Sequence, residues 1–457
     1  MNKKTIIIIF CLLLLYSLWQ RAFAQTLDAY IQKGLDSNLA IKQKSFDLKK
    51  ARLDLDRAKA LFYPQASFNS QYTLANGGRT IEVPIGDLLN NVYSSLNQLT
   101  SSAKFPQVKN QSIQFLPNDY HDTRVEVNVP LYDPQLWYNK MIKQEMITNQ
   151  EEQVNLYKRE LVNNIKQAYF QYLQSVKALT IFENALATDR ENLRFAEKLV
   201  KNNAATKEVV LKAKAEVSQV QTSLANAEQN HQNAAAYFNF LLNQPLETSI
   251  GFDSAILHTL ENELQLTMEV PEKREELMQL KSSQRALEMN LKLNQSYKLP
   301  VISGFYNIGF QGYGFKFDDR QLYQLGGLQL QWNIFKGNDN RLKVRQSEID
   351  IDAIKNQYEY AVNQIQLQAV TTYNSYKAAW EAMHNSFDEV ISTREVYRLA
   401  QSRYREGQAL QLELIDARTQ MTNAEIRYSL AQLAVLNRAS ELERVMATYN
   451  IEDHKSK

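Results

Sequence analysis

The sequence predicts a mainly α-helical protein with a smaller β part, and three observations support this prediction. Glycine and proline are scarce, with 13 Gly and 9 Pro among 457 residues. Neither residue type occurs between positions 135 and 244. Four short segments elsewhere change to the two-residue alternation of β-strands. This composition excludes collagen-like, linker-rich and mostly disordered chains, and it disfavours a glycine-punctuated α/β enzyme.

The first 24 residues are predicted to be a cleavable export signal. Two lysines at positions 3 and 4 precede a short apolar run, and the segment ends in Ala-Phe-Ala at 22–24. This pattern is typical of a secretory signal peptide. A membrane anchor, the alternative, needs a longer apolar run to span a bilayer. Cys11, the sole cysteine, lies inside the run, so no disulfide or zinc-thiolate cluster is expected in the exported chain.

Two long stretches have the composition and apolar spacing of helices. The first covers residues 135–244, with polar turn formers clustered at 201–204. The second covers about 338–446 and contains a matching break at Gly407. Each arm of such a hairpin would have roughly 65 residues and extend about 100 Å at 1.5 Å per residue. We therefore expect coiled-coil-like hairpins that pack along their length.

The alternating segments predict four strands that are apolar on one face and polar on the other. They cover residues 66–74, 123–131, 302–310 and 328–334. Alternation alone favours a half-buried sheet in a soluble domain, because the barrel signal per strand is weak. Export and the lack of a second hydrophobic helix favour the other interpretation, a transmembrane β-barrel. Four strands cannot close a barrel, so two chains would have to share eight strands, or three chains twelve.

The order helix, strand, loop, strand, helical hairpin occurs twice, which predicts an internal duplication. Asn203 at the first hairpin break aligns with Gly407 at the second, 204 residues later. The first half carries a long Asn/Ser/Gln-rich loop over 76–120, where the second has a short one. The predicted division is a first repeat at 25–244, a connector at 245–270, a second repeat at 271–447 and a tail at 448–457.

Local motifs carry a resemblance to a known family. Tyr404-Arg-Glu-Gly407 is followed by Leu-Glu-Leu-Ile-Asp-Ala at 412–417, and Val-Pro-Leu-Tyr-Asp stands at 129–133. The counterpart of the latter, at 333–337, has Asn333 for the proline and Lys336 for the aspartate. In these motifs and in element order the chain resembles TolC-type outer-membrane efflux proteins. These form the exit duct of tripartite efflux pumps and type I secretion systems.

The resemblance implies a homotrimer whose twelve strands form one β-barrel in outer-membrane lipid, continued by a periplasmic α-helical barrel. It implies a passive channel gated at its periplasmic end, working with a periplasmic adaptor (membrane fusion) protein and an inner-membrane transporter. No enzymatic activity, cofactor or nucleic-acid partner is expected, and the net charge of +2 gives no reason to expect the last of these. The alternative is a secreted or periplasmic coiled-coil scaffold without a pore.

Four residues near the second break are candidate site residues. Glu413 and Asp416 lie one helical turn apart, as on many solvated helix faces. The resemblance places them at the periplasmic entrance, where rings of carboxylates would favour cations. Gly407 suits the hairpin turn because glycine tolerates positive φ. Tyr404 fits either a closing latch or packing against a neighbouring helix.

The first tip offers different chemistry. Asn203 aligns with Gly407, but Glu208 is the only acid nearby, and Val209 occupies the position of Glu413. We therefore expect the two tips not to be equivalent.

Aromatic residues gather at both strand-to-helix junctions. They suit either core packing or an aromatic girdle at the membrane interface. Five scattered histidines show no metal-ligand spacing, so no metal or catalytic site is predicted. The junction aromatics are Trp137, Trp332, Tyr132 and Phe335.

Overall fold

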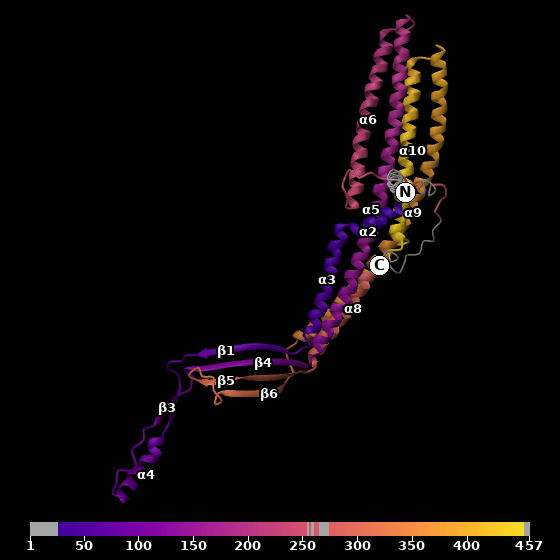
Figure 1. Cartoon of the computed structure of the whole chain (residues 1–457). Coiled ribbons are helices and arrows are strands. Elements are labelled where there is room, and N and C mark those ends of the chain that lie inside the picture. The colour runs from indigo at the N-terminus through magenta and orange to yellow at the C-terminus, as the bar shows by residue number, and fades with distance from the viewer. Residues whose placement is uncertain (1–25, 254–255, 257–259, 265–273, 452–457) are drawn as a thin grey trace, which may run out of the picture. The chain divides into compact units, whose positions relative to one another are not determined.

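The structure, a computed structural model, describes residues 26–253, 256, 260–264 and 274–451 (Figure 1). The predicted signal peptide lies outside these residues, as do parts of the predicted connector and tail. Among the helices of the described ranges, none combines the length and apolarity needed to cross a membrane.

The chain divides into two compact units, each of which draws on both halves of the sequence. One unit comprises residues up to 52, 145–285 and 351 onwards, and the other comprises 53–144 and 286–350. The helices are α2 (Leu27–Ser37), α3 (Leu39–Ala60), α4 (Ile85–Leu99), α5 (Pro134–Lys201), α6 (Lys207–Leu241), α8 (Glu275–Gln295), α9 (Asp339–Arg405) and α10 (Gln411–Met446), with a 3-10 turn at Ser296–Lys298.

Both predicted helical hairpins are present, but their arms are unequal. The outgoing helices α5 and α9 have 68 and 67 residues, whereas the returning helices α6 and α10 have 35 and 36. The expectation of equal arms of about 65 residues was therefore wrong for the returning helices.

The helix α8, which precedes β5, packs along the part of α5 that the shorter helix α6 does not reach. In the first unit, Asn149 of α5 donates to the Gln279 carbonyl oxygen of α8 at 3.1 Å, and Arg285 of α8 pairs with Glu145 at 2.8 Å. A long helix is stabilised mainly by packing against other segments, and those segments can come from a distant part of the chain. Periodicity within one stretch does not reveal which segment that is.

The main core of this unit joins α2 to α5 and α6. Tyr30 and Tyr169 are fully buried together with Phe238, with ring centroids 5.0 to 5.7 Å apart. The buried hydroxyls are satisfied by the chain after α6, because Tyr169 donates to the Gly251 carbonyl oxygen at 2.7 Å and Tyr30 accepts from the Gly251 amide. Burial raises the pKa of Tyr169 to about 12.

The second unit contains an antiparallel sheet in the order β1-β4-β5-β6. The strands are β1 (Gln65–Thr73), β4 (Tyr120–Tyr132), β5 (Val301–Tyr313) and β6 (Leu322–Gln331). All four predicted strands are therefore present, but the fourth ends earlier than expected. Gln331 pairs with Val301, which follows Pro300, so the ladder has no partner beyond that point. Trp332 and Ile334, assigned to the strand by alternation, lie after its end.

The predicted loop at 76–120 is partly folded. It contains a hairpin of β2 (Thr80–Val83) with β3 (Gln111–Gln114), and the helix α4 lies between these strands. Two asparagines shape the return from α4: Asn90 exchanges hydrogen bonds with the Val108 backbone, and Asn97 does so with the Phe105 backbone. The asparagines that indicated a loop thus stabilise a small folded insertion between β1 and β4 through side-chain hydrogen bonds to the backbone.

Candidate functional site

The second hairpin turns at Gly407, the residue that the sequence predicts there. Its φ of +73° lies in the left-handed region, which glycine enters without steric cost. The Gly407 amide donates to the Tyr404 carbonyl oxygen at 3.1 Å, and the Gln408 amide donates to that of Arg403 at 2.8 Å. This pair of hydrogen bonds is a Schellman cap, which satisfies the last carbonyls of α9.

The first hairpin uses the same turn at Asn203, the aligned residue. Asn203 has a φ of +54°, and asparagine is the residue that best replaces glycine in this conformation. Its amide donates to the Val200 carbonyl oxygen at 3.1 Å, and the next amide donates to that of Leu199 at 2.8 Å. Both turns therefore have one backbone geometry, 204 residues apart.

The two candidate acids lie on the exposed face of the first turns of α10. One Glu413 oxygen is 3.7 Å from Arg403 Nη2, while the other accepts from the Leu410 amide at 3.5 Å. Asp416 accepts from Gln420 Nε2 at 2.8 Å. Within one chain the two carboxylates thus have separate partners, and both remain accessible to solvent.

Tyr404 packs against the neighbouring hairpin. Its ring meets that of Phe195 from α5 edge to face, with centroids 5.5 Å apart. Burial raises the pKa of the Tyr404 phenol. The packing alternative from the sequence therefore describes its position in the single chain.

A buried ionic cluster near the tip was not anticipated from the sequence. Arg418 of α10 is 4% exposed, with Nε 3.1 Å from Asp189 of α5 and Nη2 2.7 Å from Glu216 of α6. Burial raises the pKa of Asp189 to about 6, against the attraction of Arg418, and the carboxylate of Glu216 raises it further. Three helices therefore share two acids and one guanidinium.

The sequence does carry a signal for this cluster. Arg418 follows the buried Leu414 by four residues, which puts a charge on the packed face of the helix. A buried charge needs a partner. The start of α10 is also tied to the start of α6, since Gln411 Nε2 donates to the Val209 carbonyl oxygen at 2.9 Å.

Glu208 at the first tip has a different role from the acids of the second. It pairs with Lys212 one turn later at 2.7 Å, and the hydrogen bond from Lys212 lowers the pKa of Glu208. Lys212 occupies the position that aligns with Asp416. The acid of the first tip is therefore neutralised by a neighbour on its own helix.

The junction aromatics all belong to the second unit, and all are exposed in the chain. Lys140 Nζ lies 5.1 Å from the ring centroid of Trp137, and Trp332 Nε1 donates to the Lys298 carbonyl oxygen at 3.0 Å. Phe335 is 83% exposed and Tyr132 is also exposed. None of the four side chains packs in a core of this chain.

Within the described ranges, no group of three or more His, Cys, Asp or Glu side chains could hold a metal ion.

The second half of the sequence matches a family model. The model is that of the outer membrane efflux protein, and it matches residues 267–448. This part of the chain is therefore similar to that family. The resemblance to TolC-type outer-membrane efflux proteins is thereby confirmed. No curated protein matches the sequence.

Solved outer-membrane channels have the same fold as this chain. The chain aligns with CusC at a TM-score of 0.75 and 14% identity, over 92% of each chain. It aligns with VceC of Vibrio cholerae at 0.72 and 14%, covering 92% of this chain and 95% of that one. For MtrE of Neisseria gonorrhoeae, crystallised in an open state, the values are 0.72 and 14%, with 92% and 89% covered.

Proposed function

We propose that the protein is an outer-membrane channel and serves as the passive exit duct of a tripartite efflux or type I secretion system. Three copies would form the duct, with the strands in outer-membrane lipid and the helices in the periplasm. Energy would come from an inner-membrane transporter, reached through a periplasmic adaptor protein. No catalytic step and no cofactor belong to this proposal.

The observation that carries the proposal is the sheet of the second unit. The pairing register places the four predicted apolar sets on one face, because Phe68 lies opposite Val125, and Val125 lies opposite Ile308. Gly304 on the same face lies opposite Leu328, which is 75% exposed. A continuous apolar face exposed on a four-stranded sheet needs either a covering layer or lipid.

The opposite face of the sheet is polar. Arg124 on β4 lies between Asp122 and Glu126 and forms ion pairs with both. The adjacent β1 strand adds Ser67 and Asn69 to this face. Apolar residues toward lipid and polar residues toward a lumen are the pattern of a transmembrane barrel.

Strand length and strand number support a shared barrel. The four strands have 9, 13, 13 and 10 residues, and about 9 to 11 are needed to cross a bilayer. β1 and β6 are edge strands, and four strands cannot close a barrel. Three chains would supply twelve strands, with β6 of each chain pairing with β1 of the next.

The exposed junction aromatics fit the same proposal. Amphipathic rings settle at the level of lipid headgroups, and Trp137, Tyr132, Trp332 and Phe335 stand where strands give way to helices. We assign them to the periplasmic girdle of the barrel. We further propose that the chain is exported by the signal peptide at 1–24. The mature chain would then consist of two repeats of one unit, at 25–244 and 271–447.

The gate is assigned to the second tip. Rings of Glu413 and Asp416 from three chains would narrow the entrance and favour cations. Opening would require the hairpin that turns at Gly407 to swing outward, separating Tyr404 from Phe195. Drug efflux and protein secretion are both compatible with this assignment.

Imaging of detergent-extracted protein tests the proposal. Negative-stain images with mass determination on the same sample should show elongated particles with threefold symmetry and three chains each. The alternative, a coiled-coil scaffold, would be released without detergent. Compact monomers or water-soluble dimers would overturn the channel proposal.

A further inference from the structure

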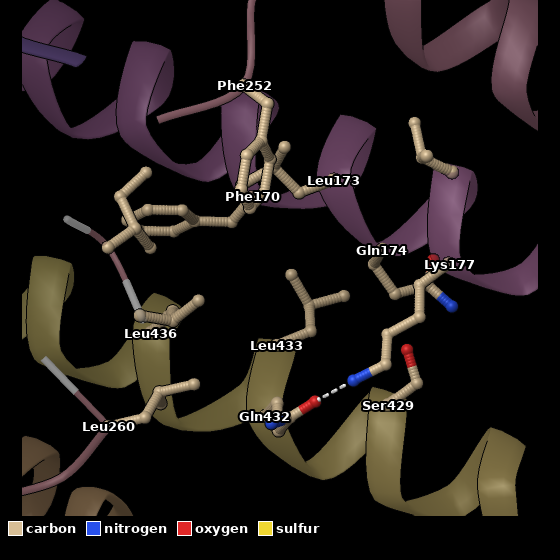
Figure 2. A pocket seen from close by; sticks show the side chains of 12 residues that line it. Phe170, Leu173, Gln174, Lys177, Phe252, Leu260, Ser429, Gln432, Leu433 and Leu436 are labelled. Atoms are coloured by element: carbon tan, nitrogen blue, oxygen red, sulfur yellow. Dashed lines mark hydrogen bonds between the residues drawn. The ribbon is translucent and has the colours of Figure 1, made fainter. Parts of the chain in front are cut away.

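A cavity of about 300 Å³ lies in the first unit between α5 and α10 (Figure 2). The segment after α6 covers it with Phe252 and Leu260. Two polar contacts join α5 to α10: Lys166 donates to Glu443 at 2.6 Å, and Lys177, which lines the cavity, donates to Gln432 at 2.6 Å. The lysines are eleven positions apart, which corresponds to about 16 Å of helix.

One end of the cavity is polar and the other is apolar. Figure 2 shows Lys177 and Ser429 together at one end, with Phe170 and Leu436 toward the other. Lys177 Nζ donates to Gln432 and lies 5.2 Å from the ring centroid of Tyr428. A cation at the edge of an apolar hollow has the features of a site for an anionic head with an apolar body.

Ser429 supplies an independent observation. Its side chain is 2% exposed, and its hydroxyl has no hydrogen-bond partner among the described residues. Buried hydroxyls are normally satisfied, and leaving one unpaired destabilises the fold. Since Ser429 lines the cavity beside Lys177, an acceptor placed there would satisfy both groups at once.

We propose that this cavity binds a small free monocarboxylic acid with an apolar body. The carboxylate would accept hydrogen bonds from Lys177 and Ser429, and the body would lie against Phe170, Leu433 and Leu436. At about 30 Å³ for each water-sized group, the cavity holds about ten non-hydrogen atoms. Octanoate has this size. The site is independent of the channel proposal, because all its residues belong to one chain.

Binding of carboxyl-labelled octanoate to the full mature protein tests the proposal by NMR, in lipid nanodiscs if the protein needs detergent for extraction and in buffer if it is released without detergent. Empty nanodiscs correct for uptake by lipid. We expect saturable binding at one site per chain, with octan-1-ol, the matched uncharged probe, binding at least about tenfold more weakly. Leu433→Trp should abolish binding by filling the hollow.

Two substitutions at the polar end of the cavity test whether Lys177 and Ser429 recognise the carboxylate or whether the cavity only takes up apolar molecules. Lys177→Met should weaken octanoate at least about tenfold and leave octanol unchanged, and Ser429→Ala should weaken octanoate about threefold. Lys158→Met, on α5 but outside the cavity lining, is the matched control and should bind like the parent. Absence of saturable binding, or equal affinity for octanoate and octanol, would overturn the proposal. So would a Lys177→Met protein with parental affinity for octanoate.

Discussion

At the first hairpin tip the chain turns at Asn203, and at the second it turns at Gly407, with the same cap hydrogen bonds. The helices that follow begin 204 residues apart, at Lys207 and Gln411. Their side chains differ in charge, since Lys212 of the first tip stands where Asp416 stands in the second. The same backbone turn is thus followed by different charges, and the second tip presents two exposed acids, Glu413 and Asp416, one helical turn apart.

The buried cluster repeats this asymmetry. Arg418 bridges α5 and α6 from α10, whereas its aligned counterpart Lys214 is exposed. The second tip therefore carries both the candidate filter and the ion pairs that tie the two hairpins together.

Removal of Arg418 is expected to have the largest effect. Arg418→Ala leaves the buried Asp189 and the half-buried Glu216 without their cation, which should destabilise the protein by about 3–5 kcal/mol. Lys214→Ala, the aligned control on an exposed face, should change stability by less than about 0.5 kcal/mol. Chemical unfolding followed by circular dichroism measures both. Equal losses of stability in the two variants would mean that the ion pairs of Arg418 do not stabilise the packing of the two hairpins.

The same cluster should make stability depend on pH. The folded state raises the pKa of Asp189 to about 6, so between its unfolded value near 4 and pH 6 the folded chain holds the extra proton. Stability should therefore fall as pH rises through this range, by up to about 3 kcal/mol. Asp189→Asn should flatten the profile, and Asp416→Asn should leave it unchanged. A parental profile that is flat between pH 4 and 6 would contradict this assignment.

The two turns should tolerate substitution differently. Gly407→Ala places a Cβ at φ +73° and should destabilise the hairpin by about 1 kcal/mol. Asn203→Gly should be neutral within a few tenths of a kcal/mol, because both residues accept this conformation. Unfolding midpoints of the two variants decide the matter, and a neutral Gly407→Ala would show that the turn can shift.

Ion selectivity should show the smallest effect. Replacing Glu413 and Asp416 together by Ala should reduce the cation preference of single channels about threefold at low salt, and less at 1 M, where the Debye length is about 3 Å. Glu208→Ala at the first tip is the control and should leave selectivity unchanged. Bilayer recordings in which the double variant kept its preference would remove both acids from the filter.

Much of the fold could be predicted because its signals are local. The clustered turn formers at 201–204 and the single Gly407 marked both hairpin ends, and alternation marked the strands. The start of β6 was missed because Gly326-Gly327 interrupts the alternation after Leu322. α4 was missed because its asparagines indicated a loop.

The features that depend on distant partners could not be predicted in the same way. Arg418 meets acids about two hundred residues away on two other helices, and no local spacing reports such a pairing. The exposed acids Glu413 and Asp416 were found through a motif, but the ring proposed for them needs three chains, and the sequence of one chain does not place the other two.

Cysteine cross-linking tests the shared barrel most directly. Cys11, the only cysteine, lies in the predicted signal peptide, so introduced thiols would act alone. Ser67→Cys on edge strand β1 can be combined with cysteine at polar-face positions of edge strand β6. These are Tyr323, Leu325, Gly327, Gln329 and Gln331.

At the matching register, oxidation should join chains into covalent trimers, because β6 of one copy would pair with β1 of the next. The pair Ser67→Cys with Glu126→Cys, opposite each other within one sheet, is the control and should close a bond inside single chains only. Covalent trimers at one β6 position would establish the shared barrel. Monomers at every position, with the control pair closed, would contradict it.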